Sequence, residues 1–155
     1  DHLRVEVDYV SLNQPDREGR IIVPHTLVWT GLRWHVRGWC EKNQDYRDFV
    51  LSRFRGEPEV LDGSDHTGAS DDDWHTLVTI EIAPDPRLTA DQQAVVAHDY
   101  GMTDGKWLLS VRAKLLPYLL QLLRLDPTQL MEDPRAQQIV IVNQADVEAW
   151  LFPSG

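Results

Sequence analysis

The sequence predicts a mainly β module followed by an α+β module, and three observations predict this order. Short runs that alternate apolar and polar residues fill positions 1–56, with almost no helical pattern between them. A stretch rich in Gly, Asp and Ser then spans positions 57–73. Strand-like and helix-like segments alternate after it. We therefore expect a small β-barrel over 1–56, an acidic linker over 57–73, and an α+β sandwich over 74–155 with its helices on one face of a sheet.

The first module is justified by strand patterns separated by turn residues. Leu3, Val5, Val7 and Tyr9 alternate with charged residues, which predicts a half-buried strand. The other elements predicted here are, in chain order, a loop over 13–19, a strand over 20–28 that is interrupted at Pro24, a strand over 33–40 and a strand over 46–54.

The second module is justified by alternating periods. Apolar residues within 74–84 predict a strand, and Thr89 followed by Gln92 predicts a capping box that opens a helix ending near His98. The remaining predicted elements are a strand over 106–112, an apolar helix over 113–125 with Pro117 in its first turn and Leu116, Leu119, Leu120 and Leu123 on one stripe, a strand over 138–143, and a terminal turn through Trp150 capped by Asp146.

The charge of the chain is distributed unevenly. Residues 1–55 hold 9 basic and 8 acidic groups, whereas residues 56–155 hold 6 basic and 17 acidic groups, which gives the net charge of −10. Such a chain repels a nucleic-acid backbone at long range. Any contact with a nucleic acid or nucleotide must therefore be local and lie in the first module.

Composition also limits the compartment and the chemistry. The single cysteine, Cys40, excludes an internal disulfide and a multi-cysteine zinc site, and it fits the reducing cytoplasm. No apolar run reaches the roughly 18 residues of a membrane span, and residues 1–10 lack the pattern of a signal peptide. We expect a cytoplasmic protein. Because the chain lacks an initiating Met and a strand pattern begins almost at once, we also expect a piece of a longer protein.

A group of cations lies within the near-neutral first part. Strand alternation places Arg33, His35 and Arg37 on one face, with Trp39 on the same side. Trp34, Val36 and Cys40 fall on the opposite face, where packing in the core is expected. Two further arginines, Arg47 and Arg53, recur on the next segment. Forked guanidinium donors around an imidazole suit an anion, although a solvated face with ion pairs to Glu41, Asp45 or Asp48 is the alternative.

Several long motifs together resemble those of the WYL-domain transcriptional regulators, especially the group encoded beside anti-phage defence systems of the BREX and CBASS kinds. The matching segments are YVS with Tyr9 and Ser11, GRIIVPH from Gly19, GLRWHVRGWC from Gly31, YRDFVLSRF from Tyr46, LTADQQAVVAHDYGM from Leu88 and SVRAKLLPYLLQLLRLD from Ser110. The Trp-Tyr-Leu that names the family stands here as Trp34-His35-Val36.

The resemblance implies an Sm-like (SH3-type) barrel for residues 1 to about 56, followed by a C-terminal extension used in dimerisation. It also implies a winged helix-turn-helix domain before the WYL domain. No segment of this sequence has the pattern of a recognition helix, so duplex DNA would be read only through that missing N-terminal domain.

The predicted ligand is an anionic effector: a nucleotide, a cyclic oligonucleotide or a short single-stranded nucleic acid. It needs forked cations, neutral or switchable hydrogen-bond donors and a flat side chain on which to stack. The predicted ligand-binding residues are Tyr9, Ser11, Arg20, His25, Arg33, His35, Arg37, Trp39, Arg47 and Arg53. We expect no metal, no cofactor and no catalytic residues, because no metal-ligand spacing or catalytic motif is found.

The sequence therefore predicts the ligand-sensing and homodimerising fragment of a DNA-binding repressor of phage-defence genes, and not an enzyme. Two alternatives stay open. One is an accessory module that binds single-stranded nucleic acid directly. The other is a pure interaction domain whose arginines contact an acidic protein surface.

Overall fold

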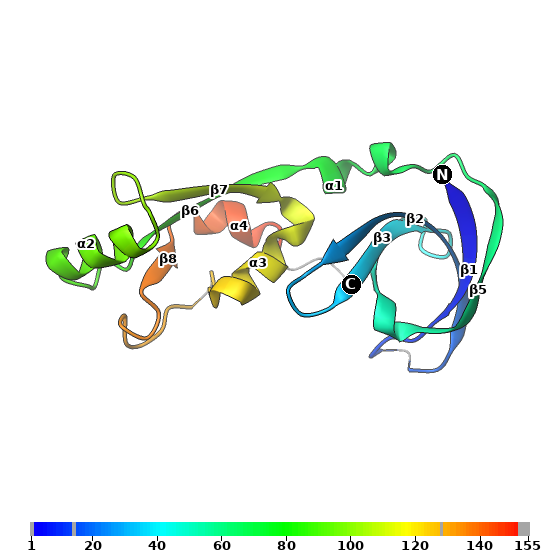
Figure 1. The fold of residues 1–155 in the computed structure, drawn as a ribbon, viewed down its shortest axis with the longest axis horizontal. Helices are drawn as coiled ribbons and strands as arrows, with labels where there is room; N and C mark the ends of the chain where they lie inside the picture. The colour runs from blue at the N-terminus through cyan, green and yellow to red at the C-terminus, as the bar shows by residue number, and fades with distance from the viewer. Residues whose placement is uncertain (1, 14, 128, 152–155) are drawn as a thin grey trace. The chain divides into compact units, whose positions relative to one another are not determined.

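The computed structural model describes residues 2–13, 15–127 and 129–151, and the chain forms two compact units that divide between residues 72 and 73 (Figure 1). Every strand pair in both units is antiparallel. The architecture is thus mainly β, as predicted, and its sheets are antiparallel. Among the described residues, no helix has the length and apolar character needed to cross a bilayer.

The first unit is one five-stranded sheet with the strand order β4-β3-β2-β1-β5. Figure 1 shows its strands curling strongly. Its strands are β1 (Leu3–Tyr9), β2 (Glu18–Trp29), β3 (Trp34–Cys40), β4 (Asp45–Val50) and β5 (Phe54–Gly63), with a 3₁₀ turn over Leu51–Arg53 between the last two. The strands predicted from Leu3 to Tyr9, over 20–28 and over 33–40 are confirmed. The strand predicted over 46–54 is broken by the 3₁₀ turn, and Phe54 already belongs to β5. The predicted loop over 13–19, in which Gln14 lies outside the described residues, ends where β2 begins at Glu18.

Alternation along the strands builds the core of this unit. The buried side chains that pack together are Val7, Tyr9, Ile22, Val36, Cys40 and Phe49. Removing each such apolar side chain from water contributes about 1.5–3 kcal/mol. The expected core position of Cys40 is confirmed, since its side chain is completely buried. One face of the sheet is thereby fixed as the inner face, and the alternate side chains of β3 lie on the outer face.

A β-bulge in β2 distorts the centre of the sheet. The register between β2 and β3 shifts between Pro24 and Thr26, so His25 is the extra residue. A Cβ atom at Gly38, the partner of Pro24, would lie 2.5 Å from the carbonyl oxygen of Val23. The interruption predicted at Pro24 is a bulge within a continuous strand, and Gly38 is the residue that lets the bulged strand approach.

The segment predicted as a linker is structured in its first half. Residues 57–63 continue β5, which pairs with β1 from Leu3↔Gly63 to Tyr9↔Phe54. The composition was misleading because β5 is an edge strand whose residues are mostly exposed, so it shows no apolar alternation, and Pro58 is tolerated at an edge. Residues 64–72 also belong to the first unit.

The second unit is a three-stranded sheet with the order β7-β6-β8, and its helices pack on one face. Its elements are α1 (Asp72–His75), β6 (Leu77–Pro84), α2 (Ala90–Asp99), β7 (Trp107–Arg112), a 3₁₀ turn over Ala113–Leu115, α3 (Leu116–Leu123), β8 (Ile139–Ile141) and α4 (Gln144–Glu148). The core joins Ile80 and Ile82 of β6 to Val96, Leu116 and Val147 of the three longer helices.

Most local predictions for this unit are confirmed. The capping box is present, with the Thr89 hydroxyl accepting from the Gln92 amide. Two of the four stripe leucines, Leu116 and Leu120, are buried. Two predictions are wrong. The strand starts at Leu77 because Trp74 lies in the helical turn α1, and the cap of α4 is Asn143, while Asp146 lies in the first turn.

Candidate functional site

The outer face of β3 carries the predicted cations. His35, Arg37 and Trp39 alternate with the inward-facing Val36 and Cys40. Arg33 immediately precedes the strand, and Arg53 ends the 3₁₀ turn after β4. We call the side chains of Arg33, His35, Arg37, Trp39 and Arg53 the arginine face.

Arg37 is the centre of a buried ion pair. Its Nε donates to Asp71 Oδ2 at 2.6 Å and its Nη2 donates to Asp71 Oδ1 at 2.9 Å, so the guanidinium fork holds both carboxylate oxygens. Arg37 is 2% exposed and Asp71 1%. Burial alone would lower the pKa of Arg37, but the bonds to Asp71 and the charge of Asp48 together raise it. The arginine is therefore a permanent cation held against an oxyanion.

His25 contacts the same carboxylate. The bulge places its Nε2 2.9 Å from Asp71 Oδ2 and its Nδ1 2.7 Å from the Thr26 hydroxyl. Asp71 is thus held by Arg37 on β3 and by His25 on β2. Two neighbouring strands supply a cationic fork and an imidazole to one oxyanion position.

His35 lies beside two further cations. Its pKa is lowered, first because the side chain is buried and then because Arg33 and Arg53 carry positive charge nearby, while Asp48 opposes the shift. Burial is the larger of the two causes. Within the described part of the chain, neither Arg33 nor Arg53 has a side-chain ion pair.

Trp39 is already stacked. The ring of His66 lies parallel to it, with a centroid distance of 3.8 Å and an interplanar angle of 7°. Tyr46 makes an edge contact with the same indole at 5.2 Å. Because Asp71 and His66 both come from the stretch after β5, we call residues 64–71 the covering segment. It lies over the arginine face.

Three predicted ligand residues lie on the other side of the sheet. Arg47 pairs with Gly38 across β3–β4 and so shares the inner side, and Arg20 pairs with Val7. Tyr9 is buried in the core, where its hydroxyl accepts from the Val50 amide and its ring receives the Arg20 guanidinium at 5.4 Å. The register, and not the composition, separates these residues from the arginine face. Ser11 follows β1 and is half-buried.

Trp34 differs from the expectation that it anchors the core. It is on the inner side, as predicted, but it is 49% exposed. Its position at the end of β3 next to the hairpin turn places it beyond the core, where its ring lies 5.3 Å from that of Trp29. An exposed pair of indoles therefore marks this end of the β2–β3 hairpin.

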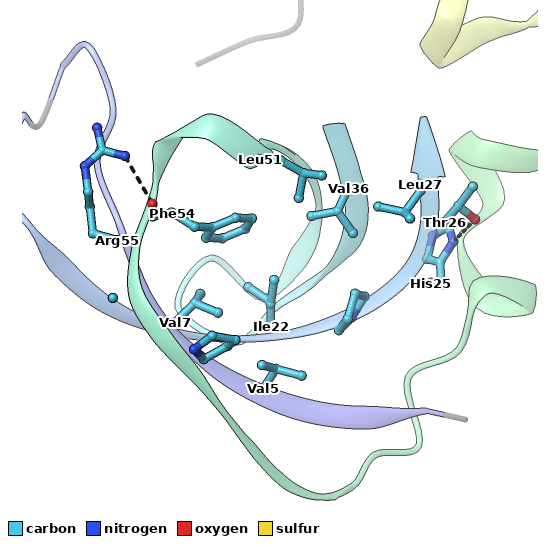
Figure 2. A pocket seen from close by; sticks show the side chains of 13 residues that line it. Val5, Val7, Ile22, His25, Thr26, Leu27, Val36, Leu51, Phe54 and Arg55 are labelled. Carbon is cyan, nitrogen blue, oxygen red and sulfur yellow. Dashed lines mark hydrogen bonds between the residues drawn. The ribbon is translucent and has the colours of Figure 1, made fainter. Parts of the chain in front are cut away.

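An apolar cavity of about 440 Å³ opens on the inner side of the sheet. Figure 2 shows Val7, Ile22, Val36, Leu51 and Phe54 turned toward it, while Arg55 points away and bonds to backbone carbonyls. His25 and Thr26 close one side of the cavity. His25 is therefore shared between the cavity wall and the Asp71 carboxylate. Such a volume is typical of small-molecule sites.

Sequence reasoning missed the residues that complete the arginine face. Asp71 and His66 lie in the stretch predicted to be an acidic linker, and Tyr46 was not among the predicted ligand-binding residues. The only signal available was charge complementarity between an acidic stretch and the cations before it. The contact between Arg37 and Asp71 joins residues 34 positions apart, and no local pattern encodes it.

Two family models match the chain. A WYL domain matches residues 1–57, and the "BrxR transcriptional regulator, C-terminal dimerization domain" matches residues 77–147. The first match covers the strands that carry the arginine face. The second covers most of the second unit.

Individual relatives agree with these matches. The DNA-binding transcriptional repressor CapW of Stenotrophomonas maltophilia is 34% identical over 97% of this chain and 50% of its own length. CapW of Escherichia coli (strain KTE188) is 38% identical over 95% of this chain and 49% of its own. The chain spans about half the length of the curated relatives it matches. A solved structure, proteasome accessory factor B/C of Arthrobacter aurescens, aligns over 97% of this chain and 24% of that one with a TM-score of 0.38 and 18% identity.

Proposed function

The chain belongs to the WYL-domain transcriptional regulators that carry a BrxR-type C-terminal dimerization domain, and from this premise we propose that it is the effector-sensing and homodimerising part of a DNA-binding repressor. The names of the CapW relatives support the repressor role and a regulatory rather than an enzymatic function. The resemblance to regulators encoded beside BREX and CBASS systems supports phage-defence genes as the target. Such a protein acts in the bacterial cytoplasm, where its DNA lies.

The first unit, in this proposal, is an Sm-like barrel. The strand order β4-β3-β2-β1-β5, the strong curl of the sheet and the short 3₁₀ turn that leads from β4 to β5 support it. The second unit joins two copies of the chain, which the dimerization-domain match supports. Duplex DNA would be bound through a helix-turn-helix domain preceding the WYL domain.

The effector, in this proposal, is a nucleotide, a cyclic oligonucleotide or a short single-stranded nucleic acid that binds the arginine face. The observation that carries it is that two cations beside the buried His35, Arg33 and Arg53, make no side-chain ion pair with any described residue. The chain has an excess of acidic side chains, with a net charge of −10, so arginines with no role beyond solubility would be expected to pair with them. Arg37, Trp39 and His25 supply the fork, the stacking surface and the switchable donor.

Binding regulates the repressor by favouring one arrangement of the dimer. An effector shifts such an equilibrium only if its affinity differs between the two arrangements. The shift changes the separation of the two DNA-reading domains relative to their half-sites, and operator affinity changes with it.

The test uses the full-length repressor and a fluorescein-labelled oligothymidine of about six nucleotides, measured by anisotropy and competed with nucleotides and cyclic oligonucleotides. Arg33→Ala and Arg53→Ala should each weaken binding of the labelled strand by at least about tenfold, because a charge-assisted contact contributes roughly 1.5–3 kcal/mol. Arg17→Ala is the matched control, since Arg17 precedes β2 and therefore lies at the opposite end of that strand from the turn that carries Arg33. Equal binding by all three variants would remove the arginine face as the effector site.

One observation favours a second function, an accessory module for single-stranded nucleic acid. The exposed Trp29 and Trp34 offer stacking surfaces outside the arginine face. Trp34→Ala would then abolish strand binding while leaving operator repression unchanged. If acidic protein, but not nucleic acid, competes for the arginines, the interaction-domain alternative is supported instead.

A further inference from the structure

The covering segment places an anion and a flat ring on the arginine face. The Asp71 carboxylate is held by the fork of Arg37 at 2.6 and 2.9 Å and by His25 at 2.9 Å. The His66 ring lies on the Trp39 indole at 3.8 Å. A nucleotide makes the same two kinds of contact, through a phosphate oxyanion and a planar base.

Polar contacts hold the covering segment in place. The Tyr46 hydroxyl donates to the Thr67 carbonyl at 2.7 Å. Gly68 lies against His25, where an added Cβ would be 3.1 Å from the ring. Among the described residues, no member of the segment belongs to either hydrophobic core cluster. The segment can therefore leave the sheet without opening the core that carries the strands.

We propose that the covering segment is an internal occupant of the effector site, with Asp71 in the place of an effector phosphate between Arg37 and His25, and His66 in the place of a stacked base on Trp39. The effector binds by displacing both groups. This inference rests on the proposed function, and it assigns the phosphate subsite and the competing residue within the arginine face.

An internal competitor selects for ligands with several contacts. A tethered group has an effective concentration in the millimolar range or above, so one free phosphate cannot displace it. A strand that also engages Arg33 and Arg53 gains contacts that Asp71 does not make. Arg33, just before β3, and Arg37 are separated by at most about 13 Å of chain, which suits two phosphates of one strand rather than a single phosphate. Oligonucleotides should therefore bind where inorganic phosphate does not.

Displacement of Asp71 also affects the chain segment that leads into the second unit. Asp71 lies one residue before the boundary of the two units, which falls between residues 72 and 73. Releasing Asp71 therefore frees the last residues of the first unit, which lead into the region matched by the dimerization-domain model. The proposed change in dimer arrangement then begins at this carboxylate.

The experiment compares Asp71→Asn with Asp65→Asn in the full-length repressor, using the labelled oligothymidine at physiological ionic strength. Asp65 is an exposed residue of the same segment, so its variant removes the same charge without touching the Arg37 fork. Asp71→Asn should bind the strand about tenfold more tightly than Asp65→Asn, because it raises the fraction of open sites. It should also bind inorganic pyrophosphate, measured as displacement of the labelled strand.

The possible results separate the two proposals. Equal affinity of Asp71→Asn and Asp65→Asn, with binding still lost in Arg53→Ala, would overturn the internal occupant and leave the proposed effector site standing. Absence of strand binding in every form of the protein would overturn both.

A second measurement does not depend on any variant folding. The amides of Ser70 and Asp71 donate to the carbonyls of Thr67 and Gly68 in the covering segment. Adding the oligothymidine to the unaltered full-length repressor should speed hydrogen exchange in residues 64–71 and slow it in residues 33–37. Slower exchange in both stretches would mean that the strand binds over the segment, and the displacement proposal would be wrong.

Discussion

Arg37 shows how a residue on a sheet can be placed by its sequence and still have an unexpected partner. Strand alternation predicted its face, and the register with β4 confirms that face by setting it opposite Asp48. Its main partner, Asp71, comes from a stretch that composition alone describes as solvated. The cationic half of the candidate site was therefore predictable, but the anionic half depends on a long-range contact for which the sequence has no period.

Arg37→Ala should destabilise the first unit by about 3–5 kcal/mol, because it leaves the Asp71 carboxylate buried without its fork. The measurement is urea denaturation followed by tryptophan fluorescence. Asp48→Ala is the control. Its contact with Arg37 is long, at 3.4 Å, and its side chain is 27% exposed, so the loss should stay below about 1 kcal/mol. Equal losses in the two variants would mean that Asp71 gains no stability from the fork.

His35 should make the stability of the first unit depend on pH. Its folded-state pKa lies below the unfolded value of about 6.5, so the unfolded chain binds more protons near that pH. The stability is therefore complete above about pH 6.5 and is lost as the pH falls toward the folded-state pKa. His35→Gln should lose less stability than the unaltered protein between about pH 7.5 and 5.5 in urea titrations. If both proteins lose the same stability over this pH range, the pH dependence arises from groups other than His35.

At the scale of elements, strands and helices that bury one side were predicted correctly from their amphipathic patterns. The exposed edge strand β5 was not. Strands β1 to β4 and helix α3 each bury one side, so their residues carry a period that the sequence displays. Helix α2 buries only Val96 and was predicted from its capping box instead. The second half of β5 buries little, and its Glu, Pro and Asp residues resemble a linker until their pairing with β1 is seen. The bulge at His25 follows from Pro24, but its register had to come from the structure.

The contact between the bulge and Gly38 predicts a sharp difference between two glycines. In Gly38→Ala, the new Cβ would meet the Val23 carbonyl oxygen at 2.5 Å and the Pro24 Cα at 2.8 Å, and backbone cannot move aside cheaply. We expect a loss of about 1–3 kcal/mol in thermal unfolding, in the range of overpacked sites. Gly63→Ala is the control, because its nearest neighbour would be 3.8 Å away. A stable Gly38→Ala would mean that the bulge can relax.

At the scale of the whole molecule, the charge division predicted from the sequence limits how an anionic strand can bind. Residues 1–55 are near neutral, so few cations are available to it. If Arg33, Arg37 and Arg53 each meet one phosphate, the logarithm of the binding constant should fall with the logarithm of salt concentration with a slope of about −2. The full-length repressor and the labelled oligothymidine provide the measurement.

Arg53→Ala should make this slope shallower by about 0.7, since one counterion-releasing contact is lost. Arg135→Ala, which removes an exposed arginine from the second unit, should leave the slope unchanged. A slope near zero in the unaltered protein would contradict an electrostatic effector site.

Cys40 has a practical consequence at this scale. It is the single thiol in the 155 residues, and its side chain has no exposed surface in the core of the first unit. A thiol in that position reacts with an alkylating reagent only in molecules whose core has opened. The rate at which Cys40 is alkylated therefore measures how often the core of the first unit opens. The second unit has no thiol and adds nothing to the signal.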